Sequence, residues 1–201
     1  MQTYKLAEDA SHPWPNEVLV EAREANLAVE GYFDAVLDDL RPLIHHYTSG
    51  FDSEATRSLL TEHLPEGPVA GVKASIIDDI LRLGSLFEST LSSGAMKLQL
   101  EIINHDMCRL FHHDFYRQRL LCTLKGPGTE WLDHVNVNRA ALGKGSNDAI
   151  VKDAEQIRRA RTNDVVLLKG ARFGGGVLSD VHRSPPIAHQ NITRIVLKLD
   201  E

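Results

Sequence analysis

The chain has 201 residues, of which 42% are hydrophobic and 25% charged, proportions typical of a soluble globular protein. Its 28 acidic and 22 basic residues give a formal charge of -6, which disfavours a protein that wraps DNA or RNA. No apolar run reaches the roughly 18 residues of a membrane span, and the opening residues MQTYKLAED lack the features of a signal peptide. Two cysteines, Cys108 and Cys122, are too few for a disulfide framework. We therefore expect a cytoplasmic protein without nucleic-acid or membrane partners, and the sequence leaves its oligomeric state open.

The two halves of the chain differ in charge. Residues 1–100 hold 16 acidic and 7 basic residues, a net charge of -9, whereas residues 101–201 hold 12 acidic and 15 basic residues, a net charge of +3. Ten of the 14 arginines lie in the second half, and the guanidinium fork suits carboxylates and phosphates. A small anionic ligand is therefore expected there, although an uneven surface charge would give the same bias.

The first half mainly predicts helices. Between residues 31 and 47, apolar residues recur at intervals of three and four, which indicates one amphipathic helix. On that helix the adjacent His45 and His46 would point in different directions and could not share a metal ion. A short helix is expected from Ser53 to the Pro- and Gly-rich stop at 65–68, and a third helix over residues 72–91.

The pattern changes after residue 94. Residues 96–102 alternate apolar and polar side chains, which predicts a half-buried strand. Further strands are expected at 119–124, 164–170, 177–183 and 193–199, with one helix at 149–161. We predict one α+β domain over residues 1–201, in which a mainly helical support region, 1–95, packs on an antiparallel sandwich or barrel formed by residues 96–201.

Candidate metal ligands lie in the segment CRLFHHDF, residues 108–115. If this segment is extended, His112 and Asp114 project from the same face, roughly 6 to 7 Å apart at Cα. With a histidine from a distant strand, such as His182, they would form the triad of two histidines and one carboxylate that leaves positions open on iron(II). A buried hydrogen-bonded pair of His112 and Asp114 without metal is the alternative.

The order His112-x-Asp114, a long gap, His182, and Arg194 on the last predicted strand resembles the Fe(II)/2-oxoglutarate-dependent dioxygenases. The resemblance covers residues 96–201 and implies a double-stranded β-helix core, that is, a jelly-roll or cupin-like core. It also implies that His112, Asp114 and His182 bind Fe(II), and that Arg194 binds the distal carboxylate of 2-oxoglutarate. The expected function is a non-haem oxygenase that takes this small anionic co-substrate, and the prime substrate stays open.

Several neighbouring residues have more than one interpretation. Arg119 shares a strand face with Thr123, so both are candidates for the co-substrate pocket, while a surface salt bridge is the alternative for Arg119. Cys108 is either an additional ligand, which would favour zinc, or a small core thiol. His189 competes with His182 as the distal ligand, although it precedes Arg194 by only five residues, fewer than the dioxygenase spacing requires.

A second resemblance rests on several longer sequence motifs. The chain is similar to an uncharacterised bacterial family of about 200 residues through five motifs. These are Cys108-x-x-x-His112-x-Asp114, Arg119-Leu120-Leu121, Gly126-Pro127-Gly128-Thr129-x-Trp131, Lys169-Gly170 and His182-Arg183-Ser184-Pro185-Pro186. Members of that family are encoded near zinc-homeostasis genes, which implies an alternative function as a non-enzymatic zinc-binding protein. The family has an aromatic residue just before its Gly-Pro-Gly-Thr segment, where this chain has Leu124.

Two further hypotheses remain. His63-Leu64-Pro65-Glu66 has the His-x-x-Glu spacing of some zinc enzymes, and His182 could complete a metallohydrolase site, but Pro65 and the following turn disfavour it. A barrel that binds a small anion without any metal is the other.

Overall fold

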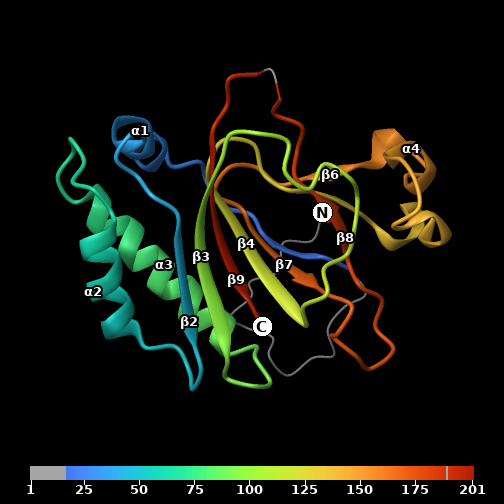
Figure 1. Ribbon diagram of the computed structural model, residues 1–201, viewed down its shortest axis with the longest axis horizontal. Coiled ribbons are helices and arrows are strands. Elements are labelled where there is room, and N and C mark those ends of the chain that lie inside the picture. Colours follow the sequence, from blue (N-terminus) through green and yellow to red (C-terminus); the bar gives the residue numbers. More distant parts are fainter. Residues whose placement is uncertain (1–16, 189) are drawn as a thin grey trace.

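The computed structural model describes residues 17–188 and 190–201, and its strands form two antiparallel sheets. The large sheet has six strands in the order β1-β7-β4-β9-β3-β2 (Figure 1). These strands are β1 (Leu19–Glu21), β2 (Leu43–Tyr47), β3 (Met96–Ile103), β4 (Gln118–Lys125), β7 (Val165–Lys169) and β9 (Arg194–Asp200). The small sheet has the order β6-β5-β8 and consists of β5 (Glu130–Leu132), β6 (Arg158–Arg159) and β8 (Val181–Arg183).

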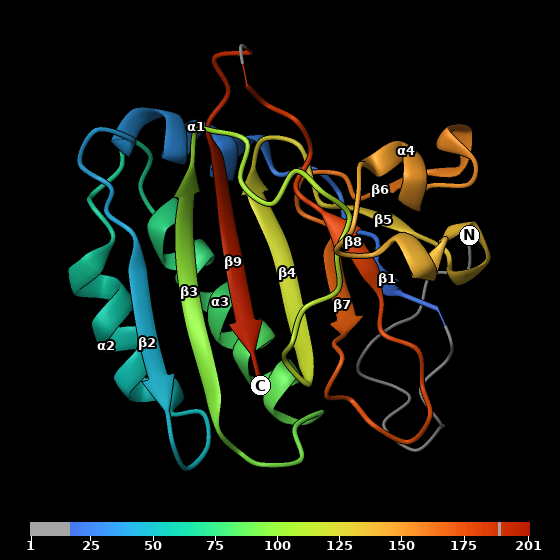
Figure 2. The same ribbon diagram turned by 45° about the vertical axis from the view of Figure 1, so that its right-hand side comes forward.

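Helices cover one face of the large sheet (Figure 2). The α-helices are α1 (Leu27–Val36), α2 (Ser53–His63), α3 (Val72–Glu88) and the short α4 (Asn147–Ile150). α1 and α3 contact β4 and β9 respectively, and α2 packs on α3. The part of the chain that the structure describes contains no helix long and apolar enough to cross a membrane.

Alternation along the strands gives the large sheet two unlike faces. In β3 and β9, the side chains of Leu98 and Leu197 belong to the core beneath the helices, and both are fully buried. Several intervening positions are polar, and Glu101 and Lys198 form an ion pair on the opposite face. Because successive side chains point to opposite faces of a strand, this register places a row of charged groups on the face away from the helices.

A second apolar cluster lies on that opposite face and joins the two sheets. It contains Trp131 of β5 together with Leu121 and Val196 of the large sheet. The preceding turn is tightly packed, because a Cβ on Gly128 would lie 2.3 Å from the carbonyl oxygen of Ala160. The small sheet therefore lies over part of the charged face and, with the large sheet, encloses the candidate site.

Most of the predicted elements are confirmed, namely the helices near 53 and 72 and the strands at 96–102, 119–124, 164–170 and 193–199. The predicted helix at 31–47 is wrong in its second half. α1 ends at Val36, and residues 43–47 form the edge strand β2, which carries His45 and His46. Pro42 explains the break, since proline lacks the amide donor that a helix interior needs and disfavours a helical conformation of the residue before it.

The predicted helix at 149–161 is also wrong, because α4 covers only Asn147–Ile150. The β-branched Val151 instead forms an isolated bridge with Val137, and Arg158–Arg159 pair with β5 as strand β6. Of the strand predicted at 177–183, only Val181–Arg183 pairs in a sheet. Tertiary pairing thus overrides local pattern in this part of the chain.

Candidate metal centre

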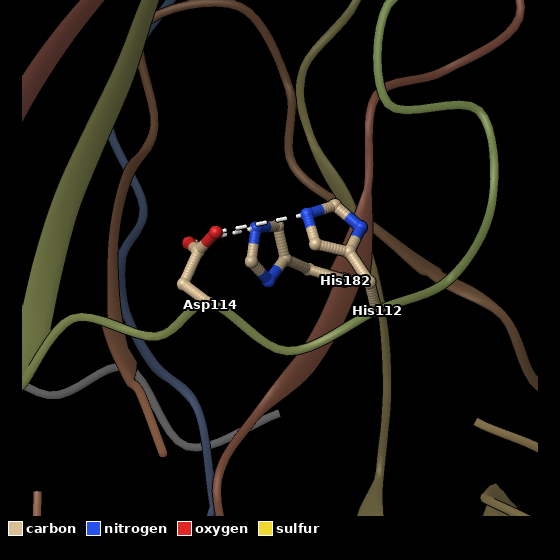
Figure 3. Close-up of side chains that lie close together, drawn as sticks. All are labelled: His112, Asp114 and His182. Carbon is tan, nitrogen blue, oxygen red and sulfur yellow. Dashed lines mark ion pairs between the residues drawn. The ribbon is translucent and has the colours of Figure 1, made fainter. Parts of the chain in front are cut away.

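Three side chains converge between the two sheets: His112, Asp114 and His182 (Figure 3). Each offers one ligand atom, and these atoms all lie within 4.8 Å of one another. His182 Nε2 is 3.3 Å from Asp114 Oδ2, and His112 Nε2 is 3.7 Å from Asp114 Oδ1. These are the three residues that the resemblance to dioxygenases implies as metal ligands.

The backbone brings the two histidines together. His182 lies in the middle of β8, and His112 exchanges two backbone hydrogen bonds with it, of 3.0 and 2.9 Å. Residues 108–115 do not form a continuous strand, since His112 makes only this isolated bridge and Asp114 lies in a loop. The two side chains therefore converge without the extended geometry considered from the sequence. The Asp114 carbonyl oxygen accepts a hydrogen bond from the amide of Ala171, which ties that loop to the end of β7.

The pKa shifts of Asp114 and His182 favour the protonation states of metal ligands. Burial alone would raise the pKa of Asp114, but His112, His182 and the charge of Arg119 lower it well below its usual range, so this carboxyl is ionised. Burial also lowers the pKa of His182, which favours the neutral imidazole that binds metals. The interaction with Asp114 raises the pKa of His112 despite its partial burial. The Nδ1 atom of His112 lies 2.9 Å from the Leu110 carbonyl oxygen, and donation of its proton there would leave the Nε2 lone pair for a metal.

The donor set fits a divalent metal. Two imidazole nitrogens and one carboxylate oxygen are the ligands of the triad that leaves open positions on iron(II), and zinc accepts the same atoms. His182 Nδ1 is buried and has no hydrogen-bond partner among the described residues, so the ring is held by packing and by its Nε2 contact. His112, Asp114 and His182 are the only group of three potential ligands that the described residues bring together.

A small cavity adjoins the two histidines, and its volume is about 40 Å³. Its lining combines residues of β3, β4, β8, β9 and the loop before β4, among them Glu101, Arg119 and Arg194. One oxygen of Glu101 accepts a hydrogen bond from Lys198, while the other is buried without a partner among the described residues. The cavity next to the triad therefore combines charged groups with apolar side chains such as Leu121 and Val196.

Arg194 is a buried cation in the wall of this cavity, with only 1% of its surface exposed. Its Nε donates a 2.7 Å hydrogen bond to the carbonyl oxygen of Pro127, and its Nη2 lies 3.4 Å from the hydroxyl of Thr123. Burial lowers the pKa of Arg194 to about 10, so the group is still charged at neutral pH. No carboxylate of the described residues forms an ion pair with it. Glu101 and Glu130 act on its charge only from beyond ion-pair distance. A buried charge without a direct ion-pair partner is costly, and a bound anion would supply such a partner.

The other predicted co-substrate residues lie on the same face. Thr123 contacts Arg194 and so helps to orient it. Arg119 points inward, but its guanidinium already has two carboxylate partners, Asp114 and Asp200. Arg119 is thus not free to bind a co-substrate carboxylate, and its salt bridges are buried rather than on the surface.

Other sequence candidates lie apart from the triad or outside the described residues. Cys108 lines the cavity but is not part of the three-ligand group. His189 is outside the described residues. His63 lies at the end of α2, where its Nε2 is 2.8 Å from the Arg41 carbonyl oxygen, and Glu66 pairs with Lys73, so the structure does not bring the His-x-x-Glu segment to His182.

Sequence reasoning missed residues that support the site. Asp200, Lys198 and Glu101 lie at alternate positions of strands whose other face is apolar, and this signal could have placed them on the cavity side. Gly170 belongs to the Lys169-Gly170 motif of the family resemblance, but that motif gives no sign of its structural role. A Cβ there would lie 1.9 Å from the Tyr116 carbonyl oxygen, so its role in holding the Asp114 loop is visible only in three dimensions.

Comparison with solved structures shows the fold. A dioxygenase for auxin oxidation (DAO) in rice matches with a TM-score of 0.52 and 12% identity, over 91% of this chain and 72% of that chain. A full-length protein of Neurospora crassa, in complex with alpha-KG, matches with a TM-score of 0.45 and 11% identity, over 91% and 73% of the two chains. The chain therefore has the mixed α/β fold, built on a large antiparallel sheet, of the rice dioxygenase.

Within this fold class, the chain belongs to the family described as protein of unknown function (DUF1826), whose profile matches residues 13–200. The membership confirms the expected resemblance to an uncharacterised family. No curated protein matches the chain.

Proposed function

We propose that the protein is a non-haem Fe(II)/2-oxoglutarate-dependent oxygenase with a jelly-roll core. The observation that carries this proposal is the combination, in one cavity, of a two-histidine, one-carboxylate triad and a buried arginine without a carboxylate partner among the described residues. The first suits a divalent metal with open positions, and the second suits a carboxylate. The fold shared with a dioxygenase is consistent with this function.

In this proposal His112, Asp114 and His182 hold iron, and Asp114 cancels one of its two positive charges. Bound iron(II) would supply the oxidation of a substrate by molecular oxygen, coupled to the decarboxylation of 2-oxoglutarate. The chain supplies orientation and a cavity lined by both charged and apolar side chains. Arg194, oriented by Pro127 and Thr123, would bind the distal carboxylate of the co-substrate.

The metal assignment is tested by single alanine substitutions at His112, Asp114 and His182. Each removes one of three ligands, so we expect anaerobically purified variants to lose stoichiometric Fe(II) that the original protein retains, as measured by elemental analysis after desalting. Circular dichroism should show that the variants still fold. Variants that keep full metal content would contradict the assignment.

The oxygenase reaction is tested separately by following 2-oxoglutarate in air. With ascorbate as the reductant, we expect Fe(II) to produce slow consumption of 2-oxoglutarate with release of succinate and carbon dioxide, even without the prime substrate, and the triad variants to lack it. Tight stoichiometric zinc that iron does not displace, together with no turnover of 2-oxoglutarate, would instead support a zinc-binding protein and would overturn the proposal.

A further inference from the structure

Arg119 connects the candidate ligand Asp114 to the C-terminal strand. Its Nη1 donates a 2.6 Å hydrogen bond to Asp114 Oδ2. Its Nε and Nη2 donate to the two oxygens of Asp200, at 2.5 and 3.1 Å. The guanidinium therefore binds Asp200 of β9 through Nε and Nη2, and its Nη1 remains for the carboxylate of Asp114.

The surroundings hold this guanidinium in place. Arg119 of β4 lies directly opposite Asp200 of β9 in the sheet register, so the backbone of two central strands sets their distance. The ring of Tyr116 packs against the guanidinium, with 4.7 Å between its centroid and Cζ. Lys97 completes the group, since its Nζ lies 3.3 Å from Asp200 Oδ2 and 3.1 Å from the hydroxyl of Tyr116. The side chain of Arg119 is only 10% exposed, so solvent screens these interactions weakly.

Asp114 itself has no comparable support from its own element. It lies in the irregular segment before β4, where no helix or strand fixes its side-chain rotation. Hydrogen bonds to ligating carboxylates orient them, and loss of such partners typically weakens metal binding about 10- to 100-fold. A carboxylate held in one orientation loses less freedom when it binds a metal.

We propose that Arg119, fixed by Asp200, is a positioning residue that orients the carboxylate of Asp114 toward the metal. The proposal rests on the metal site of the proposed function, but it does not depend on the reaction or on the co-substrate. It assigns Arg119 a role different from carboxylate binding in the co-substrate pocket, and it gives the buried Asp200 a function in the site.

The chain offers a matched control two residues away. Arg117 pairs with Glu201, with 3.4 Å between Nε and Oε2, and donates to the carbonyl oxygen of Phe173. It thus resembles Arg119 in joining the start of β4 to an acidic residue at the end of the chain, but it has no ion pair with Asp114. Substitution of Arg117 should perturb the local fold without perturbing the carboxylate of the triad.

The test measures binding of Co(II), a spectroscopic probe for the metal, by competition with a chromophoric chelator and by visible absorption. We expect Arg119→Gln to weaken Co(II) binding about 10- to 100-fold and to change the visible spectrum, since the ligand geometry changes. Arg119→Lys keeps the charge but not the fork, so its loss should be smaller. Asp200→Asn should also weaken binding, and the double variant Arg119→Gln with Asp200→Asn should bind no more weakly than Arg119→Gln alone. Arg117→Gln should stay within about twofold of the original protein.

The outcomes separate the two claims. If the original protein binds no Co(II), the metal site itself fails. If it binds Co(II) and Arg119→Gln has the same affinity and spectrum, or binds more tightly because a competing cation is gone, the positioning role is overturned. Circular dichroism checks folding. If Arg119→Gln does not fold, Asp200→Asn is the deciding variant. Unchanged Co(II) affinity and spectrum in Asp200→Asn would then overturn the positioning role of Arg119.

Discussion

At the scale of single residues, the site depends on which charges are paired within the chain. Arg119 and Arg194 are both buried arginines of the cavity wall, yet Arg119 has two carboxylate partners and Arg194 forms no ion pair with any described carboxylate. Only Arg194 therefore has its charge available for an anionic ligand. This difference, rather than the number of arginines, identifies the expected contact with 2-oxoglutarate.

The two cysteines give a test of burial. Cys122 is fully buried beneath the helices, and burial raises its pKa to about 12, whereas Cys108 is exposed. Because the thiolate is the reactive form, we expect one thiol per native chain to react with Ellman's reagent at pH 8, and two in denaturant. Rapid reaction of both thiols in the native protein would contradict the structure. Protection of Cys108 by bound metal would identify it as an additional ligand.

Much of the triad was predictable from sequence, but its supporting contacts were not. His112, Asp114 and His182 could be grouped because two are near neighbours and the third precedes Arg194 by the expected spacing. The partner of Arg119 could not, because Asp200 is 81 residues away and meets it only through the register of β4 against β9.

At the scale of elements, the Asp114 loop is positioned by the end of β7. The Gly170 amide donates to the Arg117 carbonyl oxygen, and that close approach leaves no room for a side chain, since a Cβ would meet the Tyr116 carbonyl oxygen at 1.9 Å. The obstacle is backbone, so it cannot rotate away. The glycine therefore sets how closely the loop packs on the strand.

We expect Gly170→Ala to lower the free energy of unfolding by about 1–3 kcal/mol and to weaken metal binding, because the loop must move away from β7. Urea unfolding followed by circular dichroism, together with metal titration, measures both effects. Gly31→Ala is the control, since no atom lies within 4 Å of its Cβ and it is inside α1. There we expect a gain of about 0.5–1 kcal/mol. Equal stability and metal affinity of Gly170→Ala and the original protein would contradict the role of this contact.

Element prediction succeeded where burial and periodicity agree. α3 and β3 each have one continuous apolar face, so their patterns are unambiguous. Residues 43–47 mislead because Leu40 and Ile44 continue the helical spacing by coincidence, although Ile44 is exposed and Leu43 and Tyr47 are the buried residues. A strand assignment for residues 43–47 requires knowledge of the pairing strand, β3, which is about 50 residues away in sequence.

At the scale of the whole molecule, the two halves of the chain differ in structural role as well as in net charge. The acidic first half supplies the helices that cover the large sheet, and the basic second half supplies the triad and the three arginines of the cavity lining. The halves are nevertheless interleaved, because β1 and β2 from the first half are the two edge strands of the large sheet. We propose that residues 1–95 and 96–201 fold as one domain.

This proposal predicts the behaviour of the fragment 96–201. Without the helices, the apolar face of β3, β4 and β9 would be exposed, including the fully buried Leu98, Leu197 and Leu199. We expect the isolated fragment to aggregate or to lack a cooperative thermal transition, whereas the full chain should unfold in a single transition. A fragment that unfolds cooperatively at the midpoint of the full chain would contradict one-domain folding.

The central claim is that a metal and 2-oxoglutarate bind side by side in the cavity of His112, Asp114, His182 and Arg194. Anaerobic calorimetric titration of 2-oxoglutarate into Fe(II)-loaded protein tests it most directly. We expect one 2-oxoglutarate per chain, binding that requires the metal, and an affinity about 10- to 100-fold lower in Arg194→Ala with its metal retained, since a hydrogen bond to a charged group contributes about 1.5–3 kcal/mol. Absence of binding to the metal-loaded protein, or equal affinity in Arg194→Ala, would contradict the account.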